Sequence, residues 1–433
     1  AYNTAVGGDA LLLNTTGAYG VAVGYQALQS NTTGAENVAS GYASLYTNTT
    51  GANNVAYGNS SLRYNTTASN NSAFGKDALR ANTTGAYNTA LGGSALAAAT
   101  TAIFNTAVGY KALTTTVTGQ ENTAVGMEAL KVNTAHYNTA VGSKALTANT
   151  TGSENVAVGY NSLKANTTAG ANTSIGHSTM FYTTTGANNV AIGQGSMYLN
   201  TTGTTNVAVG NASLTVNTTG ASNTAIGYKS GAAITTGGYN VAVGRQALMT
   251  TTTVNDNVAV GNNALRLNVT GSSNTAVGSS ALDANTTGTY NTAVGKSSLT
   301  ANTTGSNNSS FGFEAGMQNT TGGNLTFIGW KAGQSNTTGS NNTFVGLQNG
   351  QSTTTGTNNS ALGVSCFQSN TTGHNNVSIG YEAMQANTTA SNNTAVGLQA
   401  LKANTTASNN TAVGTGALTA NTTGTGNIAM GHY

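Results

Sequence analysis

Residues His136–Gly152 read HYNTAVGSKALTANTTG, and nearly the same segment recurs from one end of the chain to the other. Ala1–Gly17 (AYNTAVGGDALLLNTTG) and Ser272–Gly288 (SSNTAVGSSALDANTTG) are two further copies. The 433 residues hold 25 copies and a truncated last one, Thr425–Tyr433, while Gln120–Ala135 is one residue short. Because so short a segment cannot bury a core alone, the period predicts that each unit stacks on its neighbours.

The composition excludes several classes of protein. Charged residues make up 5% of the chain, against about 25% in ordinary globular proteins, and the net charge is +3. So few and scattered charges indicate no nucleic-acid partner. No apolar run approaches the roughly 18 to 20 residues that span a bilayer, so we expect no membrane insertion. Proline is absent, which favours continuous strand ladders, since proline cannot donate to them.

No linker or shift in composition interrupts the repeat, so we expect one elongated domain, residues 1–433. The sequence begins without a methionine or a signal peptide, and copies run off both ends in mid-pattern. This predicts either a mature product or a segment of a longer chain.

Numbered from Ala1, the repeat has the consensus x-x-N-T-A-V-G-x-x-A-L-x-A-N-T-T-G. All 23 charged residues fall at positions 2, 8, 9 or 12, which predicts turns at 8–9 and 17–2 and an outward site at 12. Between the turns we expect two short strands, roughly positions 3–7 and 10–16, rich in Thr and Val. Position 7 is Gly in all 26 copies, which indicates positive φ or close approach of another chain segment.

The predicted fold is therefore all-β: a parallel β-solenoid, or β-roll, of 17-residue coils. At about 4.8 Å per coil, roughly 25 coils would give a rod about 120 Å long.

Position 11 is mostly Leu, but becomes Gly333 and Gly350 in the two copies in which position 5 becomes Phe327 and Phe344. This exchange of volume indicates that positions 5 and 11 share one core. Position 6, apolar in every copy but one, then points to the opposite face of the strand. We expect that face to bury against further copies of the chain, in a homotrimer around a threefold axis or a higher homo-oligomer. Uncapped ends also make end-to-end filaments plausible.

Asn recurs at position 3 in 24 of 26 copies, which predicts a ladder of stacked amides, with a ligand site as the less favoured alternative. Asn at position 14 lies in an N-x-T sequence in 18 copies. We favour a structural Asn/Thr ladder and turn here as well, with sparse N-glycosylation left open. The candidate acceptors are Asn14, Asn31, Asn48, Asn65, Asn82, Asn149, Asn166, Asn200, Asn217, Asn268, Asn285, Asn302, Asn319, Asn336, Asn370, Asn387, Asn404 and Asn421.

The sequence offers little catalytic chemistry. The four histidines, His136, His177, His374 and His432, occupy turn positions far apart, and none has a second ligand at metal-binding spacing. Paired carboxylates and dinucleotide or phosphate fingerprints are absent, and Cys366 is alone. We therefore expect no enzyme activity, no metal and no cofactor. The exposed turn aromatics at positions 2 and 8 either cover the edge of the coil or stack on sugars.

The repeat contains the pattern N-[TV]-A-[VI]-G-x-x-[AS]-L, which resembles the head repeats of trimeric autotransporter adhesins. The segments that carry the resemblance best are NVASG (Asn37–Gly41), NVAVG (Asn155–Gly159) and NVAIG (Asn189–Gly193). The pattern is equally similar to the repeat shafts of phage tail-fibre-like proteins. The likeness covers essentially the whole chain, although adhesin head repeats are usually shorter than the unit of this chain. It implies left-handed, trimeric β-rolls displayed outside the cell.

These observations together predict an extracellular structural or adhesive fibre shaft that projects from a cell or a virion. Its expected partners are copies of itself and cell-surface glycans or another host surface. Because charge is low, we expect any adhesion to be largely insensitive to salt. The alternative is an ice-binding solenoid that presents a threonine ladder, from Thr15, Thr32, Thr49 and Thr66 onward.

Overall fold

The computed structural model describes residues 2–432 and confirms the predicted fold class, an all-β parallel solenoid of 17-residue coils. It contains 26 strands of three residues each and no helix among the described residues. The chain divides into two compact units, Ala1–Thr219 and Gly220–Tyr433, with 13 strands in each. Each unit is described by itself below.

The strands of the N-terminal unit occupy positions 4–6 of successive repeats. They are β1 (Thr4–Val6), β2 (Val21–Val23), β3 (Val38–Ser40), β4 (Val55–Tyr57), β5 (Ser72–Phe74), β6 (Thr89–Leu91), β7 (Thr106–Val108), β8 (Thr123–Val125), β9 (Thr139–Val141), β10 (Val156–Val158), β11 (Thr173–Ile175), β12 (Val190–Ile192) and β13 (Val207–Val209).

The strands of the C-terminal unit occupy the same positions of later repeats. They are β14 (Thr224–Ile226), β15 (Val241–Val243), β16 (Val258–Val260), β17 (Thr275–Val277), β18 (Thr292–Val294), β19 (Ser309–Phe311), β20 (Thr326–Ile328), β21 (Thr343–Val345), β22 (Ser360–Leu362), β23 (Val377–Ile379), β24 (Thr394–Val396), β25 (Thr411–Val413) and β26 (Ile428–Met430).

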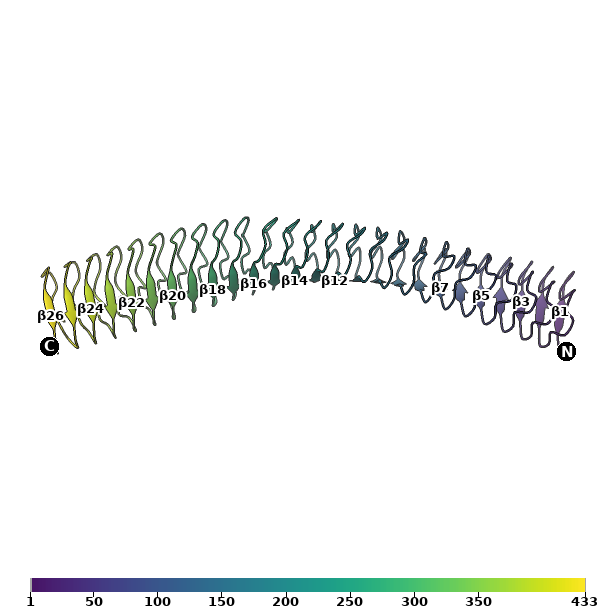
Figure 1. Cartoon of the computed structure of the whole chain (residues 1–433), viewed down its shortest axis with the longest axis horizontal. Coiled ribbons are helices and arrows are strands. Elements are labelled where there is room, and N and C mark those ends of the chain that lie inside the picture. Colours follow the sequence, from purple (N-terminus) through teal and green to yellow (C-terminus); the bar gives the residue numbers. More distant parts are fainter. Residues whose placement is uncertain (1, 433) are drawn as a thin grey trace. The chain divides into compact units, whose positions relative to one another are not determined.

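Within each unit, every strand pairs in parallel with the next strand along the chain, residue for equivalent residue (Figure 1). Ala140 lies beside Ala157, for example, and Ala157 beside Ser174. The short repeat keeps this register, because Thr123 of β8 still pairs with Thr139 of β9. The missing residue is the outer-turn threonine of position 16, so the deletion leaves the sheet unchanged.

The second predicted strand, positions 10–16, is wrong as an extended strand. This segment is a series of turns, since position 9 and, in most coils, position 11 have left-handed backbone, as at Gln26 (φ 59°) and Leu28 (φ 49°). It is nevertheless hydrogen-bonded along the stack: Leu28 N–H donates to Ser44 O at 3.0 Å and Thr32 N–H to Thr49 O at 2.9 Å. The Thr and Val residues at these positions therefore form hydrogen-bonded ladders between coils, although the backbone of the segment is not extended.

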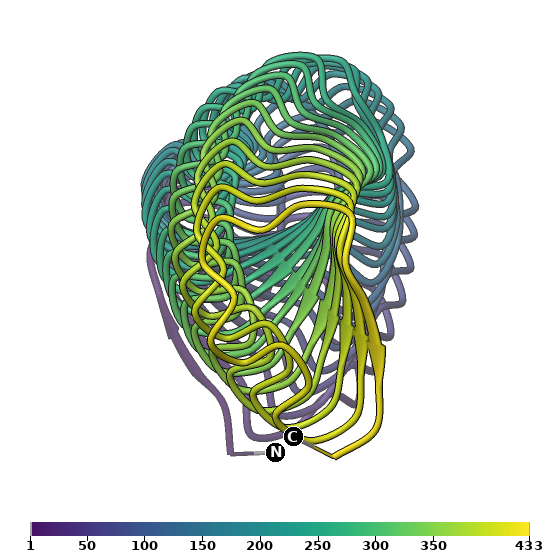
Figure 2. The ribbon, with the colours of Figure 1, turned by 90° about the vertical axis from the view of Figure 1, so that its left-hand side faces the viewer.

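The core of each coil lies between the strand and this turn segment, which form opposite sides of the green-to-yellow coils in the end-on view of Figure 2. Side chains of positions 5, 10 and 11 fill it, for example Ala140, Ala145 and Leu146, all fully buried. Alternation in the strand puts position 5 inside and position 6 outside. The predicted sharing of one core by positions 5 and 11 is thus confirmed.

The exchange of Leu for Gly at position 11 makes room for phenylalanine. Phe327 and Phe344 are fully buried and stack with ring centroids 5.4 Å apart. A Cβ on Gly333 would lie 2.6 Å from the Phe327 ring, and one on Gly350 would also collide with Phe344. Gly316, one coil earlier, completes the set, because its Cβ would lie 2.8 Å from the same Phe327 ring. Neighbouring coils therefore adjust their volumes together.

The glycine of position 7 meets both demands that the sequence predicted for it. Its φ lies between 121° and 145° in all 26 coils, a region that residues with a Cβ rarely adopt. In addition, a Cβ on Gly92 would stand 2.7 Å from the backbone of Gly109 in the next coil. Backbones of neighbouring coils therefore approach closely at the end of each strand.

We expect Gly92→Ala to lower the free energy of unfolding by about 3 kcal/mol or more, because it combines a forbidden φ with a backbone clash. Gly195→Ala is the matched control: its φ is 63°, no atom lies within 4 Å of the added Cβ, and Ala43 and Ala212 already occupy this position in other coils. The control should change the free energy by less than about 1 kcal/mol in urea titrations. Equal losses for the two variants would contradict the close approach.

Candidate functional site

The asparagines of position 3 form the ladder that the sequence predicted. Asn155 N–H and Nδ2 donate to Asn138 Oδ1 in the preceding coil, at 3.0 and 3.1 Å. Asn155 Oδ1 in turn accepts from the N–H of Asn172 in the next coil, at 3.1 Å. All three side chains are fully buried. Their amides therefore connect coils along the axis inside the protein.

A second ladder, at position 14, meets the first at one carbonyl. Asn149 Nδ2 donates to Asn133 Oδ1 of the preceding coil at 2.6 Å and to Gly152 O of its own coil at 2.8 Å. The same Gly152 O accepts from Asn138 Nδ2 at 2.9 Å. Two amides from opposite ends of one repeat thus hold the carbonyl of position 17. This arrangement closes the coil.

The candidate glycosylation acceptors are these position-14 asparagines. Sixteen of the 18 are buried, and Asn14 and Asn421, in terminal coils, are half-buried. Attaching a glycan to Nδ2 would remove that amide from the ladder. Glycosylation of these asparagines stays a prediction, and the coil would have to be unfolded when the glycan is attached.

Sequence reasoning missed a second set of N-x-[ST] sites, whose asparagines are exposed at turn positions 2 and 8. Two patterns mark these sites in the sequence: N-N-[ST] or N-L-T at positions 2 to 4, and N-[SA]-S at positions 8 to 10. These residues are Asn59, Asn70, Asn211, Asn307, Asn324, Asn341, Asn358, Asn392 and Asn409.

Where position 14 is Ala or Thr, an asparagine in the preceding coil loses the donor to its Oδ1. Ala99 follows Asn82, and Asn82 Oδ1 is buried without a hydrogen-bond partner. Thr353 follows Asn336, whose Oδ1 is likewise without a partner. An unpaired buried oxygen costs about 1 to 3 kcal/mol. These breaks offer a direct test of what the ladder contributes.

We expect Thr353→Asn to raise the free energy of unfolding by about 1 kcal/mol, because its Nδ2 would supply the donor that Asn336 Oδ1 lacks and its Oδ1 would accept from Asn370 Nδ2. Asn155→Ala should lower it by about 3 kcal/mol, because it leaves several ladder groups unpaired. Asn53→Ala, at an exposed turn position, serves as the control and should change little. Urea denaturation of the three variants measures these effects; destabilisation by Thr353→Asn would contradict the ladder's contribution.

The outer face of the strands is apolar and carries no charge. Position 6 places Val141 (36% exposed), Ile192 (37%) and Leu362 (52%) on the surface of their units. Position 4 adds a parallel row of Thr, Val or Ser, mostly half-buried. Every charged side chain belongs to the turns or to position 12. The strand face of each unit is therefore a charge-free surface of apolar side chains and hydroxyls.

The outer turn carries two rows of threonine with different roles. At position 15, Thr32 Oγ1 donates to Thr49 O in the next coil at 3.0 Å, and Thr49 Oγ1 repeats the contact with Thr66 O. At position 16, Thr33, Thr50 and their equivalents are exposed. Only the second row therefore presents whole side chains to solvent.

Several rings at turn positions 2 and 8 stack on their equivalents one coil away. Tyr25 and Tyr42 have centroids 5.7 Å apart, and Tyr87 and Phe104 5.1 Å apart. His177 stacks in the same way on Tyr160, at 5.4 Å. Each ring therefore covers the edge of its coil and leaves about half of its surface exposed.

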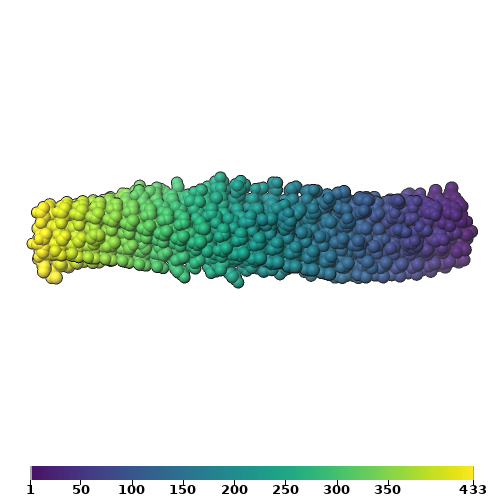
Figure 3. All heavy atoms as spheres, turned by 90° about the horizontal axis from the view of Figure 1, so that it is seen from above, coloured from purple at the N-terminus to yellow at the C-terminus, as the bar shows by residue number. Residues whose placement is uncertain are grey.

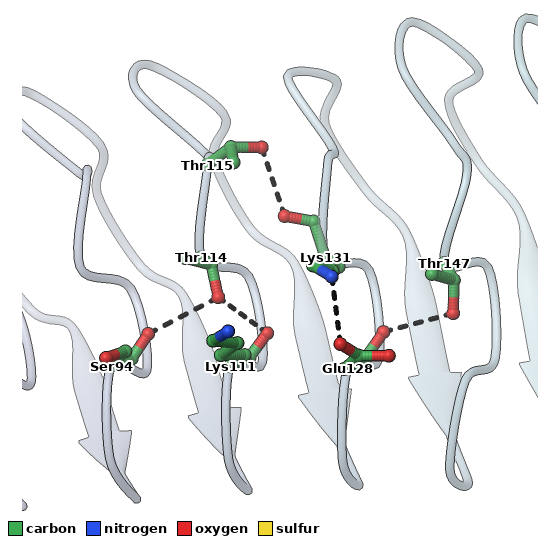
Figure 4. A network of polar contacts seen from close by, with 7 residues as sticks. All are labelled: Ser94, Lys111, Thr114, Thr115, Glu128, Lys131 and Thr147. Atoms are coloured by element: carbon green, nitrogen blue, oxygen red, sulfur yellow. Dashed lines mark hydrogen bonds and ion pairs between the residues drawn. The ribbon is translucent and has the colours of Figure 1, made fainter.

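Positions 9 to 13 carry a polar network, which Figure 4 shows for four coils of the N-terminal unit. Threonines of position 12 reach back one coil: Thr147 Oγ1 donates to Glu128 O at 3.2 Å. Lys131 Nζ lies 2.8 Å from Glu128 Oε1, and this hydrogen bond lowers the pKa of the Glu128 carboxyl. Lys402 lowers the pKa of Glu382 in the same way. On the side drawn in Figure 3, the surface of each unit is even and without a deep cleft.

The cysteine and two of the histidines have their polar atoms engaged within the coils. Cys366 is buried, which raises the pKa of its thiol to about 11. His136 and His374 use Nδ1 to accept backbone N–H groups, from Gln120 and Thr357. Within residues 2–432, no three His, Cys, Asp or Glu side chains lie close enough together to hold a metal ion.

The same described range contains no helix that is long and apolar enough to cross a membrane. No family model and no curated protein matches this chain.

Proposed function

We propose that this chain is part of an extracellular fibre shaft, adhesive along its length, that assembles from copies of itself through the strand face. The observation that carries the proposal is the charge-free strand face of each unit, on which position 6 exposes an apolar side chain in every coil but that of Ser40. Monomeric proteins rarely leave so regular an apolar surface in contact with water. A symmetric contact between copies, as in a trimer, would bury it.

The hydrogen-bonding of the coils supports a mechanical role. Most coils are closed by buried amides, and each coil is joined to the next through strand, turn and side-chain ladders. The 13 strands of one unit, spaced at about 4.8 Å, give a stack about 60 Å long. The resemblance of NVAVG (Asn155–Gly159) to adhesin and tail-fibre repeats supports a location outside the cell.

Repetition of exposed groups supports adhesion. Half-exposed rings, exposed asparagines and the threonines of position 16 recur at coil spacing. Many weak contacts made at once give avidity without any single strong site. Because charges are few, we propose that such adhesion is largely insensitive to salt.

Val141→Asp tests the contact between copies. Val141 is 36% exposed in the single chain, so the coil should fold with Asp at this site. In the assembly the carboxylate would be buried without a partner, which costs several kcal/mol. We therefore expect sedimentation velocity to show oligomers for the unchanged chain and dissociated, folded chains for the variant.

Ser143→Asp is the matched control, since it adds the same charge at a turn position where Lys76, Arg245 and Lys296 stand in other coils. It should leave the oligomer intact. A stable monomer of the unchanged chain at every concentration would contradict the proposal, as would dissociation by both variants.

Ice binding is a second candidate, favoured by the exposed threonine row of position 16 and by the charge-free strand face. The threonine row of position 15, which includes Thr32, supports ice binding less, because its hydroxyls donate to carbonyl oxygens of the next coil. An ice-binding chain should show thermal hysteresis that Thr185→Lys, in the exposed row, reduces. Freezing and melting points that coincide for the unchanged chain would remove this candidate.

A further inference from the structure

A depression lies over neighbouring coils of the N-terminal unit, on the face formed by positions 9 to 13. Its volume is about 480 Å³, within the range of roughly 300 to 1,000 Å³ typical of small-ligand sites. We propose that it binds one ring of a neutral, polyhydroxylated sugar. This inference rests on the proposed adhesive function and deepens it by naming a ligand class and a place.

The depression exists because, along the stack of coils, two large side chains at positions 12 and 13 are followed by three alanines at the same positions. Ala81, Ala97 and Ala98 form its floor, at positions 12 and 13 of their coils. At the same two positions, nearby coils carry Arg80 and Tyr64. The methyl groups make the floor apolar. A pyranose ring has one face of C–H groups, which packs well on such a surface.

One wall combines an aromatic ring with a paired donor and acceptor. The Arg80 guanidinium lies 5.8 Å from the centre of the Tyr64 ring, and Arg80 Nε lies 3.7 Å from Asp77 Oδ1. Arg80 can donate and Asp77 can accept, so together they fit two neighbouring hydroxyls. Because their charges cancel, the lining favours a neutral ligand over an anion.

The opposite side supplies hydroxyl oxygens. Thr114 Oγ1 donates to Lys111 O at 2.7 Å, and Thr115 Oγ1 to Lys131 O at 3.0 Å, as Figure 4 shows. With their protons committed to the backbone, both oxygens can accept from a ligand. The depression thus has acceptors on the Thr114 side, a donor–acceptor pair on the Arg80 side and an apolar floor between them. A sugar ring with hydroxyl groups at its edge requires such a combination.

The pocket can be filled without disturbing the fold. Gln already stands at position 12 in other coils, as Gln29, Gln334 and Gln351. Ala97→Gln should therefore fold normally while its side chain occupies the floor. Ala232→Gln makes the same change at position 12 of a coil in the C-terminal unit. It is the matched control.

The experiment measures binding of neutral gluco-, galacto- and manno-trisaccharides to the full chain by saturation-transfer NMR and titration calorimetry. A tri-galacturonate serves as the acidic comparison. We expect at least one neutral sugar to bind, Ala97→Gln and Tyr64→Ala to weaken binding at least tenfold, and Ala232→Gln to leave it unchanged. Equal binding by Ala97→Gln and the unchanged chain, preference for the acidic sugar, or no binding would overturn the proposal.

Sedimentation of the same samples keeps this result separate from the proposed function. Oligomers that bind no sugar would refute the pocket proposal and leave the fibre shaft standing. Monomers that bind a neutral sugar through Ala97 and Tyr64 would support the pocket and refute the shaft.

Discussion

Most coils close because two amides meet at one carbonyl. In the ninth coil, Asn138 near the start of the repeat and Asn149 near its end both donate to Gly152 O. Buried polar groups are tolerated only when they are hydrogen-bonded, and here each asparagine also links to the coil before it. The same contacts therefore set the size of the coil and the direction in which coils stack.

This closure determines how the rest of the coil is built. A closed 17-residue path leaves a core only as wide as Ala140, Ala145 and Leu146, so larger side chains need compensating glycines, as Phe327 needs Gly333. It also requires sharp reversals, which the left-handed residues of positions 2, 9 and 11 provide. The apolar side chains of position 6 point away from this core, because successive residues of a strand face opposite sides, and they remain on the surface.

Much of this could be predicted from the sequence, because a strict period converts each position into one environment. The stack, the role of Gly92 and its equivalents, the asparagine ladder and the pairing of Phe327 with Gly333 were all predictable. The conformation of positions 10–16 was not, since Leu28 adopts φ 49° although leucine is no turn former, and only the coil's geometry requires it. The depression beside Tyr64 was also missed, because it depends on which residues neighbouring coils place side by side.

Distances between spin labels on one row of residues test the stack most directly. Suitable label sites are Gln26, Lys111 and Ser178, which all occupy position 9 of coils in the N-terminal unit. Lys111 lies five coils from Gln26, and Ser178 lies nine coils from it. The labels are attached to cysteines introduced at these sites, in a chain whose native thiol is removed by Cys366→Ala. At about 4.8 Å per coil, electron–electron resonance should give about 24 Å for the first pair and about 43 Å for Gln26 with Ser178. Distances that do not increase in proportion to the number of coils would contradict the account.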